Sequence, residues 1–126
     1  MMCLGDAFRV NAPDYHRYVV ISDPQENGGF VVFVKLTSAD GSWDADDECI
    51  ITPQEWPDLK RNTVVEFSTC YCKKDSVDLA NAFVRLTLDR IKPPPIEVLR
   101  KILDAAKKSK QLRDKASREN LFRGEI

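Results

Sequence analysis

The order of apolar and polar residues in the first two thirds of the chain is typical of short β-strands. Residues 18–22 (YVVIS) and 30–36 (FVVFVKL) are runs of β-branched and aromatic residues, which favour strands. Asp-Pro and Asn-Gly-Gly turn signals separate the two runs, so the pattern predicts a hairpin. Further strands are expected at residues 48–52, 63–69 and 80–88. Short strands at this spacing indicate a small barrel or a curled sheet.

Three consecutive prolines at residues 93–95 end this pattern, because proline cannot donate a backbone hydrogen bond to a sheet. Beyond them, apolar residues recur at helical spacing to about Leu112, which predicts one amphipathic helix. The apolar stripe expected to be buried consists of Ile96, Leu99, Ile102, Leu103 and Ala106. The chain therefore divides into a β-domain over residues 1–92 and a proline-led helix with a charged tail over residues 93–126.

The length and charge of the chain restrict the classes of function that it can have. A chain of 126 residues suits one domain, and its net charge of -1 does not attract a polyanion or a membrane. The charge is uneven, since residues 1–95 are acidic in balance and residues 96–126 are basic. No run reaches the roughly 20 apolar residues of a membrane span, and the start lacks a signal-peptide pattern. We expect a cytoplasmic protein with no membrane association.

The residues that could bind metal are not spaced as in known metal sites. The four cysteines are Cys3, Cys49, Cys70 and Cys72. They form no C-x-x-C motif, so reduced thiols are expected, and a zinc site built from two of them with His16 lacks a fourth ligand. The acidic residues 40–48 offer oxygen ligands for calcium but do not follow the EF-hand order, which favours a solvated loop. No cofactor or metal is predicted.

Several segments, taken together, resemble the PemK/MazF-like toxin family. They are Gly5 and Asp6, the VVIS strand, the KLTS segment at residues 35–38 and the stretch DECIITPQEWPDLKRNTVVEF, all within residues 4–72. The resemblance implies a mainly β fold, a small SH3-like barrel, to which the C-terminal amphipathic helix is added. It also implies metal-independent endoribonuclease activity on single-stranded RNA, a homodimer and an antitoxin protein as partner.

The same resemblance implies which residues form the site. The family pattern has Arg-Pro six and five positions before the serine that ends its first long strand, and these positions hold His16 and Arg17 here. The hydroxyl pair of the family, at the end of the next strand, corresponds to Thr37 and Ser38. The proline is absent and the arginine is displaced by one residue, so a histidine occupies the reactive position.

These four residues contain the groups that RNA cleavage by attack of the 2′-hydroxyl requires. His16 can serve as general acid or base, while Arg17 can hold two phosphate oxygens. Thr37 and Ser38 can donate hydrogen bonds to the same phosphate, provided that the two strand ends meet. The cations predicted to bind the RNA backbone are Lys35, Lys60, Arg61, Lys73 and Lys74.

A second interpretation of the same residues is a non-catalytic SH3-like barrel that acts as a protein interaction module. In that case His16 is a surface residue, Arg17 pairs with a neighbouring aspartate, and Thr37 and Ser38 cap a turn. The two interpretations differ in geometry. The nuclease requires the side chains of His16, Arg17 and Thr37 to converge in one concave patch, whereas the interaction module allows them to lie apart.

Overall fold

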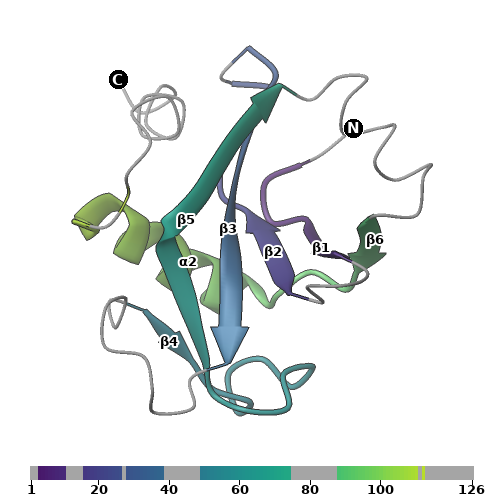
Figure 1. Cartoon of the computed structure of the whole chain (residues 1–126), viewed down its shortest axis with the longest axis vertical. Coiled ribbons are helices and arrows are strands. Elements are labelled where there is room, and N and C mark those ends of the chain that lie inside the picture. The colour runs from purple at the N-terminus through teal and green to yellow at the C-terminus, as the bar shows by residue number, and fades with distance from the viewer. Residues whose placement is uncertain are drawn as a thin grey trace.

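The structure of the chain is a computed structural model that describes residues 3–10, 16–26, 28–38, 49–74, 88–110 and 112. This part of the chain is mainly β, with six strands and one helix (Figure 1). The strands are β1 (Ala7–Val10), β2 (Arg17–Val20), β3 (Phe30–Ser38), β4 (Ile50–Ile51), β5 (Thr63–Lys74) and β6 (Leu88–Ile91), and the helix is α2 (Ile96–Lys108).

The six strands form one antiparallel sheet in the order β4-β5-β3-β2-β1-β6. The predicted hairpin is confirmed, because β2 and β3 are neighbours and Arg17 pairs with Leu36. Its connection needs glycine at positions 28 and 29, where the backbone φ angles are 78° and 91°. Only glycine adopts such angles without steric strain. The Asn-Gly-Gly turn signal in the sequence therefore matches two positions where the backbone needs a positive φ angle.

The longest strand, β5, bends over the sheet (Figure 1). Its register with β3 shifts between Val34 and Lys35, where Cys70 is the partner of one and Glu66 the partner of the other. An irregularity of this kind lets a strand bend more sharply than a regular ladder does. The strand expected at residues 63–69 is thus confirmed and extends farther, to Lys74.

The other predicted strands differ in extent from those in the structure. The strand expected at residues 48–52 is reduced to Ile50–Ile51. Of the strand expected at residues 80–88, all but the last residue lie outside the described residues, and β6 begins at Leu88. The strand β1 was not predicted, because four residues are too few to show a clear alternation.

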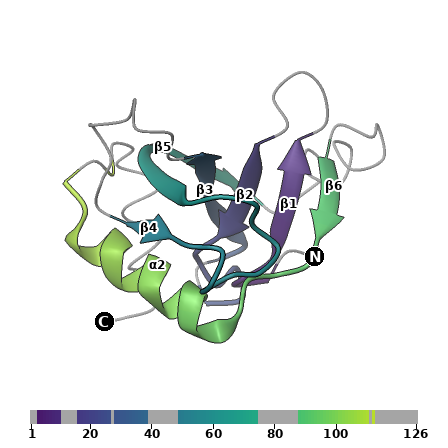
Figure 2. The same ribbon diagram turned by 90° about the horizontal axis from the view of Figure 1, so that it is seen from below.

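The main core lies between the sheet and α2, which runs along one face of the sheet (Figure 2). Its members from α2 are Val98, Leu99, Ile102 and Ala106, and its members from the strands include Val19, Val34 and Phe67. A second cluster occupies the opposite face of the sheet and consists of Phe8, Tyr18, Val20, Val31 and Phe33. The sheet therefore has apolar residues on both faces.

The predicted helix is confirmed, but the predicted stripe is wrong at one position. The helix begins at Ile96 directly after the three prolines and ends at Lys108, before the expected end at Leu112. Ile96 is 54% exposed, whereas Val98, outside the predicted stripe, is 2% exposed. The buried face of α2 includes Val98 in place of Ile96, so the first isoleucine faces water. No helix in the described part of the chain is long and apolar enough to cross a membrane.

Candidate functional site

Basic residues share a face of the sheet with the main core. Consecutive strand residues point to opposite faces, so residues two apart lie on the same face. Ala7 on β1 and Val19 on β2 belong to the main core. Arg9 and Arg17, each two residues away from one of these, therefore carry positive charge on the core face where the apolar residues end.

The sheet register brings the two arginines directly together. Arg9 is the cross-strand partner of Arg17, and Arg17 is the partner of Leu36 on the next strand. Like charges that face each other across an antiparallel pair destabilise a sheet by about 0.2–1 kcal/mol. One row farther, Ser38 is the partner of Thr63, so two hydroxyl side chains stand side by side. Cationic and hydroxyl groups thus gather at one end of β2, β3 and β5.

A turn between β4 and β5 adds two further cations. It begins with a capping box, in which the backbone N–H of Thr52 donates to Glu55 Oε1 at 3.0 Å and that of Glu55 donates to Thr52 Oγ1 at 3.3 Å. Leu59, buried like the turn's tryptophan, anchors the end of the turn in the main core. The next two residues, Lys60 and Arg61, are exposed beyond that anchor.

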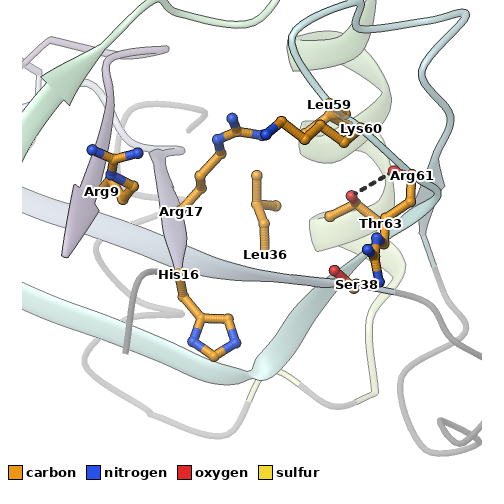
Figure 3. A pocket seen from close by; sticks show the side chains of 9 residues that line it. All are labelled: Arg9, His16, Arg17, Leu36, Ser38, Leu59, Lys60, Arg61 and Thr63. Atoms are coloured by element: carbon orange, nitrogen blue, oxygen red, sulfur yellow. Dashed lines mark hydrogen bonds between the residues drawn. The ribbon is translucent and has the colours of Figure 1, made fainter. Parts of the chain in front are cut away.

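These elements enclose a pocket of about 320 Å³ (Figure 3). It is lined by Arg9, His16, Arg17, Leu36, Ser38, Leu59, Lys60, Arg61 and Thr63. Among the described residues, the lining includes four side chains with permanent positive charge, two hydroxyl groups and two buried leucines, and no carboxylate. We call it the basic pocket. It is strongly positive although the whole chain has a net charge of -1.

Most cations of the basic pocket have no acidic partner in the part of the chain that the structure describes. Within the described residues, Arg17, Lys60 and Arg61 form no ion pair. Arg9 is 3.9 Å from Asp89, its cross-strand partner on β6, and both side chains are nearly half exposed. An exposed pair at that distance is weak. The pocket is therefore suited to an anion that several guanidinium and ammonium groups contact together.

The four predicted catalytic residues are divided between the two faces of the sheet. Arg17 and Ser38 line the basic pocket on the core face. His16 also lines it, but its imidazole is directed away from the Arg17 side chain (Figure 3). Thr37 is buried, does not line the pocket, and its Oγ1 has no hydrogen-bond partner within the described residues. Thr37 and Ser38 are divided because neighbouring strand residues alternate between faces, whereas His16 precedes β2 and lines the same pocket as Arg17.

Of the five cations predicted to bind RNA, two line the basic pocket, namely Lys60 and Arg61. Lys35 lies on the face opposite the pocket, with its Nζ 3.9 Å from Glu66 Oε2. Lys73 and Lys74 lie at the far end of β5, where they pair with Val31 and Phe30. The predicted surface is therefore smaller than expected and confined to one end of the sheet.

Two polar residues of the pocket were missed by the sequence analysis, Arg9 and Thr63. The signal for Arg9 is the short alternation AFRV, in which the arginine stands two residues from a buried alanine. Thr63 is the first residue of a strand that was predicted, and only the register shows that it faces Ser38. The sequence alone did not reveal the register between β3 and β5.

Other reactive groups in the described residues do not add to the pocket. No cluster of three or more His, Cys, Asp and Glu side chains within these residues could hold a metal ion. Burial raises the pKa of the Cys49 thiol to about 11, so at neutral pH this thiol is protonated and a poor nucleophile. The groups available in the pocket are thus cations, hydroxyls and an imidazole at its border.

The chemical capacity of the basic pocket is anion binding with room for an apolar group. Arginine side chains bind phosphate oxygens with two parallel hydrogen bonds, and hydroxyl groups can donate a further bond. The two leucines give the pocket an apolar surface beside the charges. Comparison with protein-family models and with curated protein sequences gave no match.

Proposed function

We propose that the basic pocket binds the phosphates of single-stranded RNA. The observation that carries this proposal is the pairing of Arg9 directly opposite Arg17, in a pocket whose described lining also holds Lys60 and Arg61 and no carboxylate. Such a concentration of like charge lowers stability unless an anion neutralises it. Because a polyanion gains affinity from every counterion that its phosphates release, a row of cations favours nucleic acid over a small neutral ligand.

The size and lining of the pocket favour a single strand over a duplex. A hollow of about 320 Å³ suits one nucleotide unit and is too small for a double helix. The buried side chains of Leu36 and Leu59 offer an apolar surface to a ribose or base that an unpaired strand can turn inward. The pocket thus combines backbone contacts with a surface for the nucleoside.

The test is the binding of a labelled eight-residue uridylate, measured by fluorescence anisotropy at several salt concentrations. Arg17→Gln should weaken binding about tenfold and reduce the salt slope by about 0.7, the value for one phosphate contact on a single strand. Arg100→Gln, which removes an exposed cation on α2 that is not among the lining residues of the pocket, is the matched control and should bind as the original chain does. Equal binding by the two variants would contradict the proposal.

At the level of the fold, we propose a small SH3-like barrel of the PemK/MazF-like kind in a cytoplasmic protein. The antiparallel strand order and the bend of β5 support this proposal. A homodimer and an antitoxin protein are the partners that the same resemblance suggests.

Metal-independent cleavage of the bound RNA is a second candidate function, favoured by the position of His16 at the border of the pocket. Cleavage requires the imidazole to turn toward the phosphate that Arg17 binds. Incubation of mixed-sequence RNA with EDTA present should then give 2′,3′-cyclic phosphate ends, and His16→Ala should be about 10² to 10⁴-fold slower. RNA that is bound but left intact would identify the chain as a non-catalytic binding module.

A further inference from the structure

The basic pocket extends across four neighbouring strands. Arg9 lies on β1, Arg17 on β2, Ser38 on β3 and Thr63 on β5, and these strands are adjacent in the sheet. Neighbouring strands are about 4.8 Å apart, so three intervals separate the backbones at the two ends by roughly 14 Å. This width exceeds the reach of a single phosphate group.

The polar groups of the pocket form two sets with an apolar region between them. One set is the arginine pair on β1 and β2. The other set is Arg61 together with the facing hydroxyl groups of Ser38 and Thr63. Leu36, which is 3% exposed, lies between Arg17 and Ser38 in the close view (Figure 3).

We propose that the pocket holds two consecutive phosphates of one RNA strand, which crosses the sheet perpendicular to its β-strands. One phosphate contacts Arg9 and Arg17, the next contacts Arg61 and Ser38, and the ribose that joins them lies over Leu36. The Thr63 hydroxyl donates to the carbonyl oxygen of Arg61 at 3.1 Å and so helps to hold Arg61 in place (Figure 3). This inference rests on the proposed function, because it assigns positions to the phosphates of the same ligand. The inference excludes two alternatives. One is a site that binds a single phosphate, and the other is a diffuse basic surface with no preferred length of RNA.

Ligands that differ only in their number of phosphates test the inference. Uridine 5′-monophosphate, pUpU and pUpUpU carry one, two and three phosphates, and calorimetry can compare their affinities for the intact chain. The second phosphate binds as part of a molecule already held by the first, so pUpU should bind at least about tenfold more tightly than the monophosphate. The third phosphate lies outside both sets, so its gain should be less than about threefold.

Variants assign each phosphate to its set. Arg61→Gln and Arg17→Gln should each remove most of the gain of pUpU over the monophosphate, because each variant disables one of the two sets. Arg100→Gln is again the control for loss of one exposed positive charge. Three results would overturn the inference. They are equal affinity for one and two phosphates, a steady gain in affinity with every added phosphate, and a gain of pUpU over the monophosphate that survives Arg61→Gln. Failure of the intact chain to bind any uridylate, the eight-residue strand included, would instead refute RNA binding itself.

Discussion

Two arginines that face each other carry the functional argument at the scale of single residues. Arg9 and Arg17 are direct partners in the sheet, and only Arg9 has an acidic partner within the described residues. In a protein selected for stability alone, one of these positions would be expected to hold an acidic or neutral residue. The pair fits our proposal that the protein exchanges stability for affinity toward an anion.

This exchange predicts that Arg17→Gln stabilises the free protein although it weakens RNA binding. Removing one of two facing charges should raise the free energy of unfolding by up to about 1 kcal/mol. For a chain of this size the melting temperature should rise by about 2 to 5 °C. Thermal unfolding at low and high salt checks this, since the gain should shrink as salt screens the repulsion. A lower melting temperature at low salt would show that Arg17 serves the fold instead.

The sequence indicated that His16, Arg17, Thr37 and Ser38 lie at the ends of two adjacent strands, and the structure has them there. It did not indicate which faces they occupy. A side chain changes face with each step along a strand, so Thr37 and Ser38 lie on opposite faces, whereas His16, which precedes β2, lines the same pocket as Arg17. Residues two apart, such as Ala7 and Arg9, are the ones that share a face.

At the scale of elements, the helix could be predicted more accurately than the strands. The spacing of Leu99, Ile102 and Ala106 fixes a face of α2 without knowledge of its neighbours. The strands β1 and β6 are short. β6 is the edge strand of the sheet, and β1, its neighbour, forms backbone hydrogen bonds with it. Short elements of this kind depend on contacts that are distant in sequence, which a local pattern does not contain.

A matched pair of isoleucines on α2 tests how this helix is seated. Ile102 is fully buried in the main core, whereas Ile96 is 54% exposed. Ile102→Ala should lower the free energy of unfolding by about 2–5 kcal/mol, because it leaves a cavity in the core. Ile96→Ala should change it by less than about 0.5 kcal/mol. Urea unfolding of both variants measures the two values, and similar losses would mean that the helix lies differently on the sheet.

At the scale of the whole molecule, a polar clamp joins the last helix to the turn that carries two pocket cations. Lys101 Nζ on α2 donates to the carbonyl oxygen of Ile50 at 2.6 Å and to Glu55 Oε2 at 2.9 Å. Glu55 is also the acidic residue of the capping box with Thr52. Through these contacts the helix and the turn that leads to Lys60 are held together, independently of the apolar core.

The clamp makes stability depend on pH. The hydrogen bond from Lys101, and then that from the backbone of Thr52, lower the pKa of Glu55 below its usual value of 4.5. A carboxyl group with a lowered pKa in the folded state stabilises the protein above its unfolded pKa, and this contribution disappears as pH falls through the folded pKa. The melting temperature of the original chain should therefore exceed that of Glu55→Gln at neutral pH, and the difference should diminish below pH 4.5. A difference that stays constant with pH would contradict an ionic clamp.

Segments near the two ends of the described chain contact each other, and this affects the order in which the sheet can form during synthesis. β1 pairs with β6, and Gly5 approaches α2 so closely that an added Cβ would lie 3.0 Å from Leu99 Cδ2. During synthesis β1 can pair with β2 early, but its other neighbour, β6, is made only after the five other strands of the sheet. During that interval the nascent chain exposes the apolar face that α2 later covers, which is when a chaperone has most to protect.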